Sequence, residues 1–191
     1  MKLLEDRIRK DGKIIGTEIL KVDSFLNHQL DVALFREMAR EWKRRFEGTR
    51  VTKILTIEAS GIAMAVIAAE AFGDCPVVFA KKSRTSNLPD DAYTTKVASF
   101  THGKTYDVLV SKRFLTPDDS VLVIDDFLAN GEALSGLIDL VRQSGGTVSG
   151  CCIAIEKAFQ GGGEKIRSLG YRVESLAKIA SMNGSSIEFE D

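Results

Sequence analysis

Apolar residues along the chain recur at two spacings, which predict helices and strands in turn. From Phe35 to Phe46 the apolar positions lie three and four residues apart, as on one face of a helix, and Gly48 follows as a stop signal. Short uninterrupted apolar runs between such stretches are typical of buried strands. Helices are expected near 3–11, 35–46, 62–72, 134–141 and 163–169, and strands near 53–57, 76–80, 106–111, 121–124, 148–155, 171–176 and 187. This alternation predicts an α/β fold with a mostly parallel central sheet flanked by helices.

The composition is that of an ordinary globular protein. Hydrophobic residues make up 44% and charged residues 28% of the 191 positions, which favours a single domain over residues 1–191. The 26 basic and 27 acidic side chains leave a net charge of −1. Proteins that bind nucleic acids or membrane surfaces normally have a basic excess, so neither kind of partner is expected.

The cysteines and the N-terminal stretch indicate the cellular compartment in which the protein is expected. The three cysteines form neither a disulfide framework nor a zinc motif, and buried thiols are typical of a reducing environment. The charged stretch MKLLEDRIRKDGK differs from a signal peptide, and no apolar run approaches the ~20 residues of a transmembrane helix. The sequence therefore predicts a cytoplasmic protein.

Two adjacent acids follow the apolar run at 121–124, and a short loop containing Gly131 leads from them to the next helix. Ligands of a parallel sheet bind beyond the carboxyl ends of its strands, which makes this loop the first candidate site. Backbone N–H groups at a helix N-terminus bind phosphate, and Asp125 and Asp126 can accept hydrogen bonds from neighbouring hydroxyls. The pattern favours a phosphorylated sugar, although Asp126 or Asn130 would also suit a simple helix cap.

A second strand-to-helix loop, at 58–61, is also built of small residues and is a second candidate anion site. Ser60 is an ordinary N-cap residue as well, so this loop alone is a weak signal. Lys81 and Lys82 end the strand that lies between the two loops in sequence. Together these features predict a ligand with phosphate groups at opposite ends.

The residues of these loops resemble a known family. The segment from Val121 to Ala133 resembles the ribose-5-phosphate signature of type I phosphoribosyltransferases, and the whole chain is similar to the xanthine phosphoribosyltransferases. Further similar stretches are TIEASGI at 56–62, VVFAK at 77–81 and LGYRVESLAKI at 169–179. The residues that narrow the resemblance to the xanthine enzymes are Leu20, Asn27, Ala129-Asn130-Gly131 and Glu156-Lys157.

The resemblance implies transfer of a 5-phosphoribosyl group from phosphoribosyl pyrophosphate (PRPP) to a purine by a homodimer that uses Mg²⁺, held mainly through PRPP and pyrophosphate. It implies that Asp125 and Asp126 are the catalytic residues, which bind the ribose hydroxyls near the developing positive charge. The residues implied for the 5′-phosphate are Ala129, Asn130, Gly131, Glu132 and Ala133. Those implied for pyrophosphate are Ala59, Ser60, Gly61 and Lys81.

For the purine, the resemblance implies Lys157 near the 6-oxo group, Asn27 near the 2-oxo group and Leu20 beside them. Phe127 directly follows the paired acids, and from this spacing we expect it to offer a face to the purine ring. A lysine only donates hydrogen bonds, so it disfavours the 6-amino group of adenine. Each residue also has an ordinary structural role open to it: Lys157 at a solvated strand end, Leu20 in the core and Asn27 in a turn.

The resemblance further implies the type I phosphoribosyltransferase fold, with a small hood formed by about 1–30 and 175–191 and a flexible lid near 82–103. Glu132 departs from the family, in which an uncharged amide is common at this position. The departure matters because an extra negative charge beside a phosphate is unfavourable. Ala129 stands where hypoxanthine–guanine enzymes have an aspartate. The missing carboxylate suits xanthine, which is the more acidic oxopurine.

Two other functions stay open. The 6-oxo group of guanine or hypoxanthine would accept a hydrogen bond from Lys157 equally well. Asn27 is the only candidate residue that distinguishes the purines at the 2-position. A regulator of this fold that binds PRPP without turning it over is the second alternative. Such repressors have an N-terminal DNA-binding domain, and the first long helix, expected near Asp31, leaves no room for one.

Overall fold

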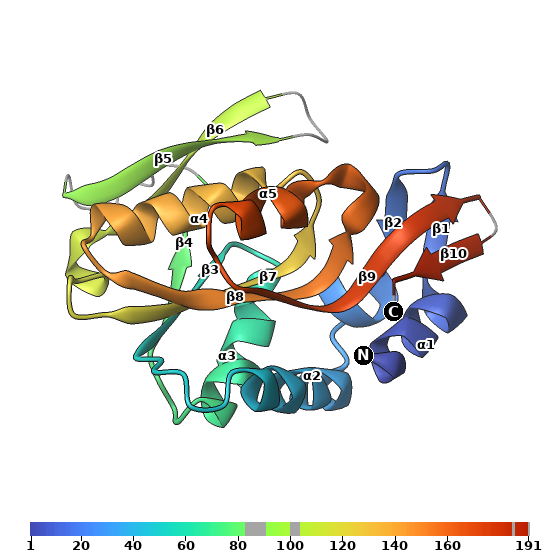
Figure 1. The fold of residues 1–191 in the computed structure, drawn as a ribbon, viewed down its shortest axis with the longest axis horizontal. Coiled ribbons are helices and arrows are strands. Elements are labelled where there is room, and N and C mark those ends of the chain that lie inside the picture. The colour runs from blue at the N-terminus through green and yellow to red at the C-terminus, as the bar shows by residue number, and fades with distance from the viewer. Residues whose placement is uncertain (83–90, 100–103, 185, 191) are drawn as a thin grey trace.

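The computed structural model describes residues 1–82, 91–99, 104–184 and 186–190. Within these residues a six-stranded sheet runs in the order β10-β9-β8-β7-β3-β4 (Figure 1). Neighbouring strands are parallel except β9 and β10, which are antiparallel. The strands are β3 (Lys53–Ile57), β4 (Val77–Ala80), β7 (Ser120–Leu128), β8 (Thr147–Lys157), β9 (Val173–Asn183) and β10 (Ser186–Phe189). The predicted α/β fold with a mostly parallel sheet is confirmed.

Helices cover both faces of the sheet, with α2 (Val32–Arg45) and α3 (Gly61–Ala71) on one side and α4 (Glu132–Gln143) and α5 (Gly162–Ser168) on the other (Figure 1). Side chains of a strand alternate between faces, so a central strand must be apolar on both. In β7, Leu122 and Ile124 join the core beneath α2 and α3, whereas Val121 and Val123 join the core beneath α4. This double burial is why the run at 121–124 is continuously apolar.

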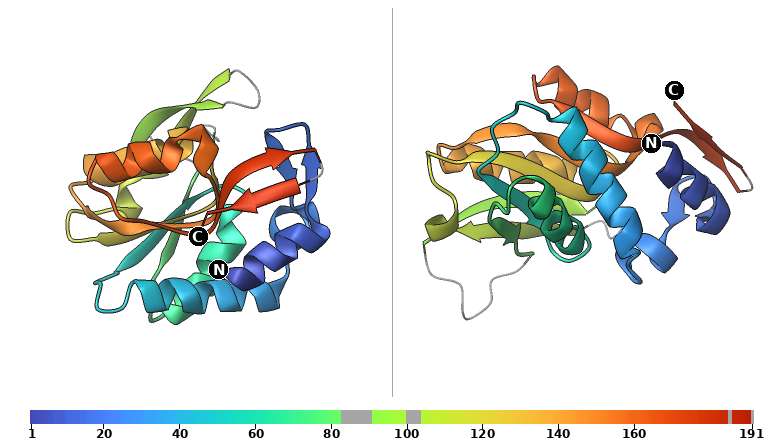
Figure 2. Two further views of the ribbon diagram at one scale, coloured as in Figure 1. Left: turned by 45° about the vertical axis from the view of Figure 1, so that its right-hand side comes forward. Right: turned by 90° about the horizontal axis from the view of Figure 1, so that it is seen from below.

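The N-terminal segment lies beside the far end of β9 and β10 (Figure 2). It consists of α1 (Lys2–Asp11), the hairpin β1 (Lys13–Ile15) and β2 (Ile19–Lys21), and the π-helical turn η1 (Asp23–Asn27). These elements, with the end of β9 and β10, are the segments for which the hood is predicted. The hairpin is absent from the sequence prediction, because strands of three residues are too short to show an alternation of apolar and polar positions.

β5 (Ala92–Ser99) and β6 (Lys104–Ser111) form a separate antiparallel ribbon, followed by the short 3-10 turn η2 (Lys112–Phe114). The strand predicted at 106–111 is present, but it pairs with β5 and not with the central sheet. β5 packs against α4, and a bridge between Lys81 and Leu109 joins β6 to the end of β4. Of the predicted lid at 82–103, residues 83–90 and 100–103 lie outside the described residues, and 92–99 form β5.

None of the helices in the described part of the chain is long and apolar enough to cross a membrane.

Candidate active site

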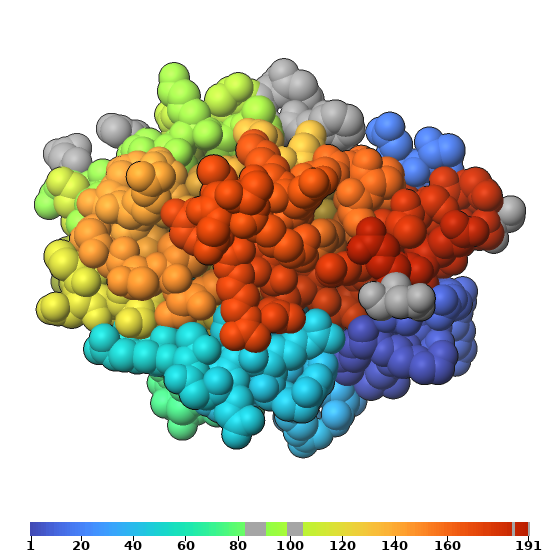
Figure 3. All heavy atoms as spheres, in the orientation of Figure 1, coloured from blue at the N-terminus to red at the C-terminus, as the bar shows by residue number. Residues whose placement is uncertain are grey.

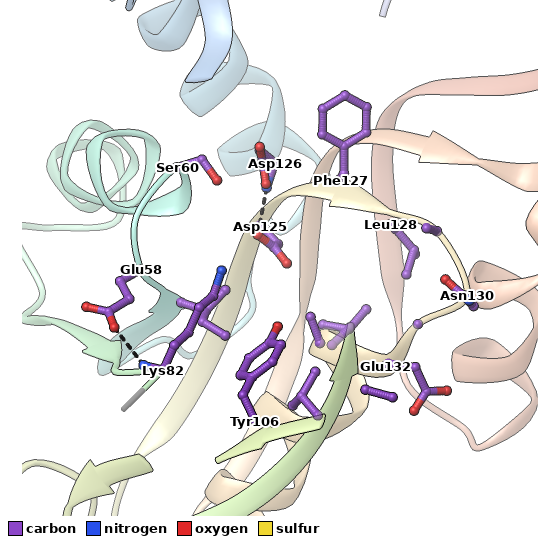
Figure 4. Close-up of a pocket in the computed structure, with 17 residues that line it drawn as sticks. Glu58, Ser60, Lys82, Tyr106, Asp125, Asp126, Phe127, Leu128, Asn130 and Glu132 are labelled. Atoms are coloured by element: carbon purple, nitrogen blue, oxygen red, sulfur yellow. Dashed lines mark hydrogen bonds between the residues drawn. The ribbon is translucent and has the colours of Figure 1, made fainter. Parts of the chain in front are cut away.

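The order of the strands brings the two candidate loops together. β3 and β7 are adjacent and parallel, and the chain continues from β3 to β4 on one side and from β7 to β8 on the other. A sheet with such a reversal has a crevice at the carboxyl ends of the two strands. A cavity of about 340 Å³ lies there, and we call it the acidic pocket (Figure 4). The predicted site residues that line it are Ser60, Asp125, Asp126, Phe127, Ala129, Asn130, Gly131, Glu132 and Ala133.

Asp125 and Asp126 are buried at the end of β7, with relative exposures of 5% and 9%. The backbone N–H of Asp126 donates to Oδ1 of Asp125 at 2.9 Å, and the Asn27 amide donates to Oδ2 of Asp126 at 3.2 Å. Burial, reinforced by the neighbouring charge of Asp126, raises the pKa of Asp125 well above its usual range. Two adjacent carboxylates with so little solvent favour a ligand that brings hydroxyl donors or positive charge.

The loop at 129–133 turns directly from β7 into α4. Gly131 has φ +83°, a backbone conformation that favours glycine, and α4 begins at the next residue. Among the described residues no side chain caps this helix, so its first N–H groups are available to a ligand. The end of β7 and the first residues of α4 line the same pocket (Figure 4). The arrangement suits an anion beside a hydroxylated sugar.

The negative charge of Glu132, beside this anion site, is compensated by an ion pair. Its Oε1 accepts a hydrogen bond from Nζ of Lys165, on α5, at 2.9 Å. The two side chains are 42% and 49% exposed, so the pair is solvated and its charges largely cancel at the loop. The unfavourable charge expected from the sequence is therefore offset by a residue 33 positions away.

The second loop, at 58–61, forms the opposite wall. Ser60 lines the acidic pocket and also an adjoining side hollow lined by Asp23, Asn27, His28 and Ala59. Gly61 begins α3 against Thr56, whose Oγ1 would lie 2.0 Å from a Cβ at position 61, so a larger residue does not fit there. Oε1 of Glu58 accepts a hydrogen bond from the backbone N–H of Lys82 at 2.6 Å (Figure 4). This bond ties the loop to the end of β4.

The structure brings Lys82, and not Lys81, to the acidic pocket. Lys81 lines a separate hollow on the outer side of β4 and β6. Adjacent residues of an extended chain point to opposite sides, so one residue of the Lys81-Lys82 pair faces the pocket and the other faces away. The two lysines can be recognised in the sequence, but which of them faces the pocket depends on the register of β4.

Tyr106 is a pocket residue that no pattern in the sequence singles out. It projects from β6 toward Asp125, and Nζ of Lys82 lies 5.7 Å from the centre of its ring (Figure 4). Burial, and then the charge of Asp125, raises the pKa of Tyr106, so its hydroxyl keeps its proton and can donate to a ligand. The ribbon of β5 and β6 thereby completes the wall opposite the 58–61 loop.

Of the residues predicted for the purine, Lys157 lies beside Phe127, and Asn27 is bonded to Asp126. Nζ of Lys157 lies 5.6 Å from the centre of the Phe127 ring and donates to the carbonyl oxygen of Glu18 at 2.5 Å. Burial lowers the pKa of Lys157. Leu20 lies on β2, where its side chain is 7% exposed and lines a separate cavity between α1 and β10. Lys157 and Phe127 thus form an amphipathic edge: an aromatic face with a hydrogen-bond donor beside it.

Comparison with known proteins agrees with this geometry. The family model described as the phosphoribosyl transferase domain matches residues 21–190. The chain belongs to the phosphoribosyltransferase family. A phosphoribosyltransferase named xanthine phosphoribosyltransferase, from Lachnoclostridium phytofermentans, is 60% identical over 183 residues, which is 96% of this chain and 94% of that one. Another of that name, from Ruminiclostridium cellulolyticum, is 55% identical over 191 residues and all of both chains.

Solved phosphoribosyltransferases share the fold. APRTase from Giardia lamblia, in complex with 9-deazaadenine, superposes with a TM-score of 0.76 over 92% of this chain and 97% of that one, at 23% identity. The adenine phosphoribosyltransferase from Thermoanaerobacter pseudethanolicus gives a TM-score of 0.73 over 92% and 99%, also at 23% identity. The type I phosphoribosyltransferase fold expected from the sequence is confirmed.

Proposed function

We propose that this phosphoribosyltransferase transfers the 5-phosphoribosyl group of PRPP to N9 of xanthine, giving xanthosine 5′-monophosphate and pyrophosphate. The observation that carries the proposal is the position of Asp125 and Asp126 between two helix-opening loops and next to the Phe127–Lys157 edge. A ribose with a phosphate at each end spans such a pocket, and a purine lies against the edge. The names of the relatives at 55–60% identity support xanthine as the base.

PRPP binding follows from the two loops and the acids between them. The N–H groups of the 129–133 loop bind the 5′-phosphate, and Ala59, Ser60 and Gly61 receive pyrophosphate. Lys82, which lines the pocket, takes the role that the sequence suggested for Lys81. The carboxylates of Asp125 and Asp126 accept hydrogen bonds from the 2′- and 3′-hydroxyls.

The bond from C1′ to pyrophosphate oxygen breaks as N9 bonds to C1′, and positive charge develops on the sugar. Fixed carboxylates at this position stabilise that charge without reorganising during the reaction. Xanthine stacks on Phe127 and accepts at its 6-oxo group from Lys157. We assign the 2-oxo group to Asn27, whose amide donates to the neighbouring Asp126 in this structure. A base that binds as its anion needs no carboxylate at Ala129 to remove a proton.

The donor set of the pocket fits Mg²⁺. Within the described residues no three His, Cys, Asp or Glu side chains converge as a metal site. Mg²⁺ is commonly held by one or two carboxylates together with substrate phosphates and water, so Asp125 and Asp126 are sufficient protein donors. When bound, the ion would supply positive charge that offsets the negative charge of pyrophosphate. We expect PRPP to provide most of its ligands.

The function is tested by offering xanthine, guanine, hypoxanthine and adenine separately with PRPP and Mg²⁺. Xanthine should give the highest kcat/KM. A preference for guanine or hypoxanthine would assign the chain to the other oxopurine activity. Binding of PRPP without turnover of any base would identify a regulator, and a preference for adenine would exclude the role given to Lys157.

Replacing Lys157 with Ala should lower kcat/KM for xanthine by ~10- to 100-fold, since a hydrogen bond from a charged donor to a buried acceptor contributes about 1.5–3 kcal/mol. The KM for PRPP should change little, because Lys157 lies on the purine side of the pocket. Steady-state kinetics with each substrate varied in turn measures both constants. Lys178, on β9 and paired with Glu190, is the control position. An equal loss for both substrates would contradict the assignment.

We also propose that the protein works as a homodimer in the cytoplasm. Phe79 and Phe114 are 41% and 51% exposed around the hollow of about 560 Å³ between β4 and η2, an apolar surface of the kind that homodimers bury. Replacing both with Asp should shift the protein from dimer to monomer in sedimentation velocity. Leu169, 63% exposed on the loop after α5, is the control.

The three cysteines, all in the described ranges, are free and buried, which suits a reducing compartment.

A further inference from the structure

The short helix α5 lies outside the acidic pocket and contacts both the 129–133 loop and the end of β8 next to Lys157. It sits at the surface beside α4 (Figures 1 and 3). One set of its residues reaches the end of β8, where Lys157 stands, and another reaches the 129–133 loop. The pairing of β7 with β8 extends to Leu128 and Glu156, and Lys157 pairs with Ile179 of β9, so strand pairing holds Lys157 but does not reach the 129–133 loop.

The contact with β8 is an ion pair between a buried carboxylate and a partly exposed guanidinium. Glu156, 2% exposed, precedes Lys157 and points to the opposite side of the strand, where its two oxygens accept from the guanidinium of Arg167 at 2.7 Å each. The hydroxyl of Ser175 on β9 donates to the same carboxylate. A Cβ at Gly163 would lie 1.8 Å from Oε1 of Glu156, so the glycine makes room for the pair. A two-pronged bond of this kind fixes direction as well as distance.

The contact with the 129–133 loop is made by the first turn of α5. The backbone N–H of Gly162 donates to the carbonyl oxygen of Ala129 at 3.0 Å. Gly162 also lies so close that a Cβ there would be 2.1 Å from that oxygen and 2.5 Å from the nitrogen of Gly131. Lys165 adds its ion pair with Glu132. The loop therefore rests on α5 through its backbone.

We propose that α5 sets the distance between the 129–133 loop and Lys157, and that Glu156 and Arg167 are positioning residues for PRPP and the purine. The inference rests on the function proposed above. Ion pairs with a buried partner contribute little net stability compared with apolar residues of the same size, so a role in geometry better explains this one, in which Glu156 is buried. Errors of about 1 Å in the placement of reacting groups cost up to ~10²-fold in rate, so a brace between the two subsites matters.

The test replaces Glu156 with Gln and, separately, Arg167 with Lys, which keeps a charge but loses the two-pronged bond. Each variant should raise both the KM for xanthine and the Kd for PRPP by about tenfold, although neither residue touches either ligand. The Kd is measured by calorimetry without a base, well below the unfolding midpoint of each variant. Glu174→Gln is the matched control, because Glu174 lies on the neighbouring strand β9 and pairs with Arg45 and Arg172 away from the pocket.

The dependence of the PRPP Kd on Glu156 decides the inference. If a folded Arg167→Lys or Glu156→Gln variant binds PRPP within twofold of the wild-type Kd, α5 does not set the loop position. The same conclusion follows if Glu174→Gln raises the Kd equally. A wild-type protein that binds PRPP but does not use xanthine would overturn the proposed base, while the Kd comparison would still decide the role of α5.

Discussion

Replacing Asp126 with Asn is expected to lower kcat by about 10²–10³-fold, the usual cost of losing one preorganised electrostatic group. The amide has nearly the same shape but no charge to stabilise the developing cation. It also replaces one acceptor oxygen with a donor, and Asn27, which now donates to Oδ2, would face a second amide. Single-turnover and steady-state rates with saturating PRPP and base measure the effect on the chemical step.

Asp119 is the control for this prediction. It is also a buried acid, 8% exposed, and it is paired with Lys53 at 2.8 Å outside the acidic pocket. Asp119→Asn should lower the unfolding midpoint and leave kcat within about twofold of wild type, because the carboxylate acts on stability alone. If Asp126→Asn retained wild-type kcat, the acids at the end of β7 would not face the reacting sugar, and the proposed reaction would lose its basis.

Replacing Gly162 with Ala is expected to raise the KM for PRPP by about 10²-fold, through displacement of the 129–133 loop. The added Cβ would meet the carbonyl oxygen of Ala129 and the nitrogen of Gly131, both of which are backbone atoms. A side chain could rotate away, but backbone atoms move only if the loop moves. Since the loop provides the N–H groups for the 5′-phosphate, its displacement weakens PRPP binding.

The matching control is Gly184→Ala, in the hairpin between β9 and β10, where no atom of the described residues lies within 4 Å of the added Cβ. This variant should bind PRPP as the wild type does. Inorganic phosphate or ribose 5-phosphate offers a second measurement for Gly162→Ala, because both depend on the same N–H groups. An unchanged KM for PRPP and an unchanged affinity for ribose 5-phosphate would show that the phosphate binds elsewhere.

The parts of the pocket that are continuous in sequence could be predicted from the sequence. The apolar run at 121–124, the acids at its end and Gly131 are neighbours along the chain, so their spacing fixes their proximity once a strand and a helix form. The stripe from Phe35 to Trp42 likewise predicts α2, because a helix buries whatever its spacing places on one face. The family resemblance then indicated PRPP and a purine, and the family is confirmed.

Contacts between distant segments could not be predicted in this way. Asn27 and Asp126 are separated by 99 positions, and Lys165 and Glu132 by 33. From the sequence, the charge of Glu132 beside a phosphate site is unfavourable. Its partner Lys165 lies on α5, and no local pattern predicts how that helix packs. The purine-side edge also depends on pairing, because Phe127 and Lys157 approach through the register of β7 with β8.

The sequence by itself determined the class of fold, the strand-to-helix loops and the paired acids, because each depends on the order of residues within about a dozen positions. The tertiary structure decided that Lys82 and not Lys81 lines the pocket, that Tyr106 also lines it and that α5 contacts both Glu132 and Glu156. The physical reason is that the direction of a side chain depends on strand register and helix packing. Both are set by the burial of apolar surface across the whole chain.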